Sequence, residues 1–160
     1  MIVKRDLRIG DIEKHLSDII DTLEVIANNM PSDFHEFKNI GLVKDGLYKK
    51  VEFVIESIID ICNIINSDLR LGVPEVEDNI IDNLGRKKIF DEKVVELIKE
   101  MKGFRNILVH KYGEIDDSKA YESIKDGLKD FEIIIKEVEK FLAGRKKECG
   151  GKFCGGGFSR

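Results

Sequence analysis

The chain has 160 residues, which suits a single domain and leaves little room for two. Its 27 basic and 31 acidic residues give a net charge of -4, which excludes broad electrostatic attraction to nucleic acid, so any contact with RNA must be local. No stretch is apolar for long enough to span a membrane, and the first residues lack the apolar core of a secretory signal. We therefore expect a cytoplasmic protein without a membrane partner.

The first quarter of the chain has the apolar spacing of a surface helix. Apolar residues recur every three or four positions from Ile9 to Ile26, which predicts a helix over residues 5–28. Pro31 should follow its end, because proline cannot continue the backbone hydrogen-bond ladder. A short amphipathic helical piece is expected over residues 32–40.

The next stretch, residues 42–72, has too many apolar positions for one narrow stripe. We expect its helix to be the most buried one, with Cys62 as a small core residue. A Gly and a Pro interrupt the pattern and predict a loop over residues 71–78. Residues 79–85 then predict a short helical step that Gly85 closes.

Two long helices are expected in the second half of the chain. Asp91 can cap a helix that runs directly into residues 103–113. The run from Asp116 to Ser118 can cap a last helix that continues to Leu142.

Four long helices joined by short connections predict an all-α fold, an antiparallel helical bundle with additional short helical pieces. The domain should cover residues 1–143, followed by a flexible Gly- and Cys-rich tail over residues 144–160. Cys149 and Cys154 in this tail lack a second ligand pair, so they are only a weak metal signal. We expect no metal and no cofactor.

Residues 103–113, GFRNILVHKYG, gather side chains that suit work on a phosphodiester. Arg105 presents a planar, permanently charged fork for phosphate oxygens, and His110 can take or give a proton near neutral pH. Asn106 lies about 40° from His110 on a helix and can hydrogen-bond to it, and Tyr112 supplies a hydroxyl. No carboxylate cluster at metal-binding spacing accompanies them, which favours metal-free cleavage through the RNA 2′-hydroxyl.

Helix geometry limits how this set can act. Arg105 and His110 are about 140° out of phase, so they can serve one phosphate only if the helix ends near His110 or a second subunit completes the site. The residues also fit structural roles taken singly: His110 could close a helix, Arg105 could pair with a carboxylate of the preceding long helix, and Tyr112 could simply pack.

Arg105, His110 and Tyr112 form the pattern R-x4-H-x-Y, and on this pattern residues 5–143 resemble the HepT-like toxins of the HEPN superfamily. The resemblance implies a helical bundle that dimerises, so that the Arg and His of both subunits line one cleft. It implies metal-independent ribonuclease activity on an RNA substrate. It also implies a partner, an MNT-type nucleotidyltransferase antitoxin, which can neutralise the toxin by adding AMP to Tyr112.

The same resemblance makes Arg105 and His110 catalytic and Asn106 the residue that orients them. Independently of it, Glu56 and Asp60 on the preceding long helix are candidate carboxylates for positioning Arg105. Two other functions remain open. The acidic composition favours a non-catalytic nucleotide-binding or adaptor subunit of a minimal nucleotidyltransferase, and the motif could also be packing in a structural helical dimer.

Overall fold

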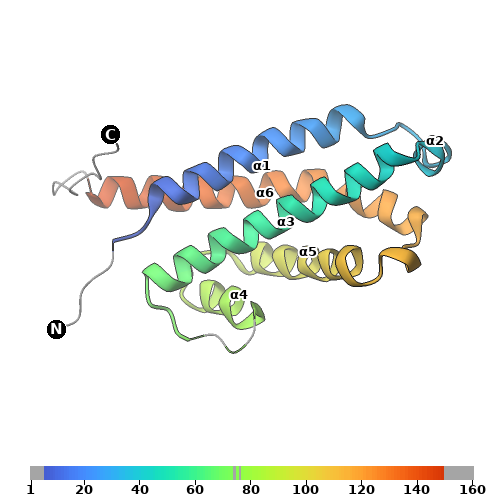
Figure 1. Ribbon diagram of the computed structural model, residues 1–160. Coiled ribbons are helices and arrows are strands. Elements are labelled where there is room, and N and C mark those ends of the chain that lie inside the picture. The colour runs from blue at the N-terminus through green and yellow to red at the C-terminus, as the bar shows by residue number, and fades with distance from the viewer. Residues whose placement is uncertain (1–5, 74, 76, 150–160) are drawn as a thin grey trace.

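The computed structural model describes residues 6–73, 75 and 77–149. Its long helices alternate in direction and form an antiparallel bundle, while short helical pieces lie in the connections (Figure 1). The long helices are α1 (Ile9–Asn29), α3 (Leu42–Asp68), α5 (Glu92–His110) and α6 (Asp117–Cys149), and the short pieces are α2 (Phe34–Asn39), α4 (Glu77–Arg86) and the 3-10 helix η1 (Tyr112–Glu114). The residues that the structure describes include no strand, and the all-α prediction is confirmed.

Helix α3 lies at the centre of the bundle and contacts α1, α4 and α5. Its buried apolar side chains run from Leu47 to Ile65, which confirms the prediction that it is the most buried helix. Cys62 is 1% exposed and belongs to the core, and burial raises the pKa of its thiol to about 12. Within the described ranges, no helix combines the length and apolarity that a membrane crossing needs.

Helix α1 begins at Ile9, whereas the sequence predicted a start near residue 5. The backbone N–H of Arg8 donates to Oδ2 of Asp68 at 2.9 Å, and its Nε donates to the same oxygen at 3.0 Å. Asp68 is almost fully buried at the end of α3. These hydrogen bonds tie Arg8 to the end of α3, and α1 begins at the next residue.

Gly85 does not close the short helix, so that prediction is wrong: α4 continues through it to Arg86. A Cβ atom on Gly85 would lie 3.0 Å from Cγ2 of Val95, so glycine permits the close approach of α4 to α5. The left-handed residue in the following turn is Lys88, with φ 54°.

Helix α6 extends to Cys149, whereas we predicted that a flexible tail covers residues 144–160. An ion pair between Lys146 and Glu13 joins the last turns of α6 to the first turns of α1, which supports helix beyond the predicted end. The remainder of the predicted tail, residues 150–160, lies outside the described residues.

The two predicted capping sites differ in the structure. Asp91 occupies the N-cap position of α5, but its side chain makes no capping hydrogen bond. At the start of α6, Oδ1 of Asp116 accepts hydrogen bonds from the backbone N–H groups of Ser118 at 3.0 Å and Lys119 at 3.2 Å. Asp116 is therefore the capping residue of α6, and Asp117 is left to bind side chains of α3.

Candidate active site

The motif lies at the carboxyl end of α5 and in the turn after it. Arg105, Asn106 and His110 belong to the last turns of α5, which ends at His110, and Tyr112 begins η1. The helix end near His110 is one of the two conditions under which Arg105 and His110 could serve one phosphate. Asn106 and His110 are both exposed to solvent.

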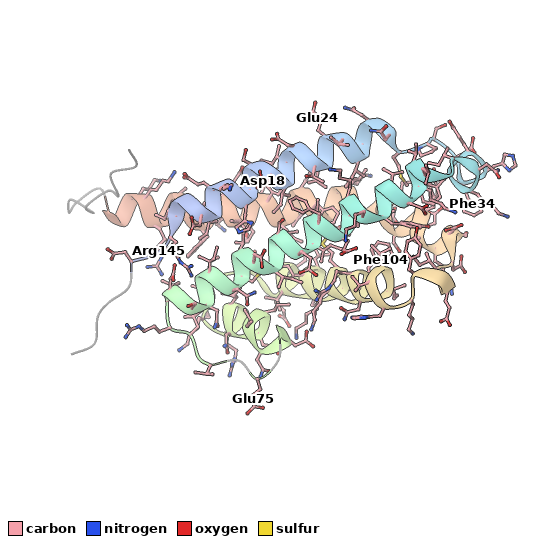
Figure 2. The ribbon with its side chains drawn as sticks, in the orientation of Figure 1. Asp18, Glu24, Phe34, Glu75, Phe104 and Arg145 are labelled. Carbon is pink, nitrogen blue, oxygen red and sulfur yellow. The ribbon has the colours of Figure 1, made fainter. Side chains whose placement is uncertain are left out.

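Arg105 faces α3 and is mostly covered. Its side chain is 11% exposed, and its Nη1 donates to Oε1 of Glu56 in an ion pair. The preceding residue, Phe104, packs against the core and lies between α3 and α5 (Figure 2). Asp60 is exposed one turn further along α3. Of the two carboxylates proposed from the sequence, the structure therefore places Glu56 against the guanidinium.

One subunit does not place Arg105 and His110 on the same side of α5. The two positions differ by about 140° around the helix axis, with Arg105 turned towards α3 and His110 towards solvent. In the part of the chain that the structure describes, no hydrogen bond joins the side chains of Asn106 and His110. The imidazole is thus open to a substrate or to a second subunit.

The exposed face of α5 around His110 is partly apolar. Ile107, three positions before His110, is 42% exposed. Gly103, seven positions before His110 and within about 20° of it, has no atom within 4 Å of the place where a Cβ would lie. Gly103 therefore leaves open space on this exposed face, about two turns before His110.

Tyr112 joins η1 to the first turn of α3. The Tyr112 side chain lies on the surface, 52% exposed, and its hydroxyl donates to Oδ1 of Asp45. This hydrogen bond is the main reason that the pKa of Tyr112 is raised. Beside it, the Tyr48 hydroxyl donates to Oδ1 of Asp117 at 2.5 Å, and Lys44 donates to Oδ2 of Asp117 at 2.8 Å.

The ionisation of Tyr48 and Asp117 follows from the groups around them. Tyr48 is buried, and burial together with the bond to Asp117 raises its pKa. Burial alone would raise the pKa of Asp117, but the hydrogen bonds from Lys44 and Tyr48 outweigh it and the pKa is lowered. The carboxylate therefore stays charged and fixes the start of α6 against α3.

Asp45 and Asp117 were not predicted as neighbours of the motif. Asp45 and Tyr112 are 67 positions apart, and no local pattern connects them. The described residues contain no group of three or more His, Cys, Asp or Glu side chains that could hold a metal ion. What the site offers is a guanidinium, an imidazole and a phenol, all suited to phosphate esters.

The helical bundle and the motif at the end of α5 define a protein of the HEPN class. Residues 12–138 match the model of the HepT-like ribonuclease family, and the chain belongs to this family. The predicted resemblance and the predicted HEPN-like fold are therefore confirmed.

Named relatives support this assignment. The mRNA nuclease HepT of Shewanella oneidensis is 28% identical over 107 residues, which are 67% of this chain and 80% of that protein. The tRNA nuclease HepT of Aphanizomenon flos-aquae is 24% identical over 129 residues, 81% of this chain and 86% of that protein. A solved structure of the tri-AMPylated Shewanella oneidensis HEPN toxin in complex with MNT antitoxin has a TM-score of 0.74 and 25% identity, and the match covers 81% of this chain and 97% of that one.

Proposed function

We propose that this chain is the toxin of a HEPN/MNT toxin–antitoxin pair and a metal-independent endoribonuclease. The observation that carries the proposal is the R-x4-H-x-Y motif at the open end of α5 in a chain of the HepT-like family. His110 is exposed there, and Glu56 holds the Arg105 guanidinium. Arg105 and His110 are the proposed catalytic residues.

The proposed reaction uses the RNA 2′-hydroxyl as the nucleophile. A His110 imidazole accepts the 2′-hydroxyl proton, the 2′-oxygen bonds to phosphorus, and the bond from phosphorus to the 5′-oxygen breaks. A protonated imidazole supplies the proton to the leaving 5′-oxygen. Arg105 stabilises the charge that develops on the phosphate oxygens. The products are a 2′,3′-cyclic phosphate and a 5′-hydroxyl end.

A homodimer would supply both imidazoles and resolve the angular mismatch along α5. The apolar surface of Ile107 and the open space at Gly103 lie on the same face as His110, which favours close packing of a second copy there. In such a dimer the Arg105 and His110 side chains of both copies would line one cleft. Asn106, exposed on this face, is proposed to orient them.

The proposed antitoxin is an MNT-type nucleotidyltransferase that adds AMP to Tyr112. Tyr112 is half exposed, so a modifying enzyme can reach its hydroxyl. The Shewanella oneidensis toxin described above is tri-AMPylated and in complex with an MNT antitoxin. AMP on Tyr112 would place a negative charge two residues after His110, where it would repel an RNA phosphate.

The test is RNA cleavage by the purified chain in EDTA, after removal of any partner and of AMP. The parent should release ends with a 2′,3′-cyclic phosphate, while His110→Ala and Arg105→Ala should lose at least about 100-fold of the rate. His35→Ala, which removes an exposed imidazole from α2, is the matched control and should cleave like the parent.

Equal cleavage by the parent and His110→Ala would contradict the assignment of His110. If no form cleaves RNA, but the chain binds nucleotide and the transferase in a way that depends on Arg105, the adaptor function is correct instead.

A further inference from the structure

The hydrogen bond between Tyr112 and Asp45 has no role in the proposed RNA cleavage. It joins the first turn of α3 to η1, and it occupies the one proton of the Tyr112 hydroxyl. We propose that Asp45 is the base that accepts this proton when AMP is transferred to Tyr112. This role rests on the proposed function, in which Tyr112 is the modified residue.

The geometry leaves the Tyr112 oxygen ready to attack. Because the hydroxyl donates its proton to Asp45, the lone pairs of the oxygen point away from that carboxylate. The Tyr112 side chain is 52% exposed, so an electrophile can approach these lone pairs from solvent. Asp45 is itself exposed and can pass the proton to water afterwards.

The proposed transfer of AMP requires no reactant besides Tyr112, Asp45 and a nucleoside triphosphate. The Tyr112 oxygen bonds to the α-phosphorus of a nucleoside triphosphate that the transferase binds. The bond from this phosphorus to the bridging oxygen breaks, and pyrophosphate leaves with the electron pair. The phenol proton moves to Oδ1 of Asp45. Base assistance is needed because the Asp45 hydrogen bond raises the pKa of Tyr112, so free phenolate is scarce at neutral pH.

Asp117, the other carboxylate that acts on the pKa of Tyr112, is already engaged. Asp117 already accepts hydrogen bonds on both oxygens, from Tyr48 on Oδ1 and from Lys44 on Oδ2. Tyr48 is buried and is a donor in this pair. Among the groups around η1, Asp45 is thus the carboxylate that contacts the reacting oxygen.

A reagent that needs no partner tests the base directly. The probe is 5′-(4-fluorosulfonylbenzoyl)adenosine, which reacts with phenol oxygens and releases fluoride, and labelling of Tyr112 is followed by peptide mass at neutral pH. Asp45→Asn should slow labelling by at least about tenfold, and Asp45→Glu should recover part of the rate. Asp117→Asn removes a nearby carboxylate whose hydrogen bonds come from Lys44 and Tyr48 and whose charge raises the pKa of Tyr112, so it should label at least as fast as the parent.

The opposite result has a clear meaning. Without a role for the base, removing the Asp45 charge would lower the pKa of Tyr112 and increase the phenolate fraction. Asp45→Asn would then label as fast as the parent or faster, and that outcome overturns the proposal.

A second arm separates this inference from the proposed function. The chain, its nucleotidyltransferase partner, ATP and Mg²⁺ are mixed, and AMP on Tyr112 is measured by mass. Transfer to Asp45→Asn should be slower than to the parent by at least about 100-fold. Equal transfer to both overturns the role of Asp45 alone. Absence of AMP on Tyr112 of the parent overturns the proposed modification and this role with it.

Discussion

Replacing Glu56 with Gln removes the negative charge opposite Arg105 and keeps the size of the side chain and one acceptor oxygen. The guanidinium is 11% exposed, whereas the Glu56 side chain is 42% exposed. Exposed pairs contribute about 0–1 kcal/mol, and breaking a fully buried pair costs about 3–5 kcal/mol. With one partner covered and the other open, we expect the free energy of unfolding to fall by about 1–2 kcal/mol, or Tm by about 3–6 °C.

A double-mutant cycle isolates this interaction. Urea unfolding of Glu56→Gln, Arg105→Gln and the double variant, at one protein concentration because assembly contributes to stability, should give a coupling of about 1–2 kcal/mol. The control cycle uses Lys49 and Glu52, a 2.9 Å pair on the same helix in which the lysine is 76% exposed. Its coupling should be below about 0.5 kcal/mol.

The result that would refute this reasoning is a coupling between Glu56 and Arg105 no larger than that of the control pair. The burial of Arg105 would then add nothing to the ion pair. Glu56→Gln should also slow RNA cleavage, because the guanidinium loses the charge of its ion pair with Glu56 and is oriented less firmly. Unchanged cleavage would show that Glu56 does not position Arg105.

Three further predictions follow from the packing and the charges. Gly85→Ala should destabilise the fold by about 1–2 kcal/mol, since a methyl group 3.0 Å from Val95 Cγ2 costs more than the gain in helix propensity. Gly144→Ala, with open space around it, should increase the free energy of unfolding by about 0.5–1 kcal/mol. Urea unfolding measures both variants, and a change of the same sign in Gly85→Ala and Gly144→Ala contradicts the packing argument. Asp117 has a folded pKa below its ordinary value of 3.8, so its contribution to stability is complete above that value and is lost as the pH falls through the folded pKa. Asp117→Asn should therefore flatten the fall of stability in acid, and an unchanged profile in pH-dependent unfolding refutes this. The buried thiol of Cys62, with its pKa raised to about 12, should resist iodoacetamide at about pH 8 in the folded chain and react after unfolding in urea; mass mapping that finds equal rates would place Cys62 outside the core.

The positions of the helices followed from local pattern. Apolar spacing predicted the long helices, and α1 ends at Asn29, just before Pro31, as expected. The errors lie where distant contacts decide. The start of α1 depends on Asp68, and the role of Gly85 depends on Val95, partners that no local window contains.

The sequence by itself determined the helical class, the family and the position of the motif residues, because periodicity and motif spacing are properties of neighbouring positions. Glu56 and Asp60 are one turn apart on α3, about 40° from each other, so no helical period distinguishes them. The packing of α5 on α3 is what places the Arg105 guanidinium against Glu56. The contact between Asp45 and Tyr112 likewise exists only because the bundle brings the start of α3 to the turn after α5, and side chains 67 positions apart meet through tertiary packing alone.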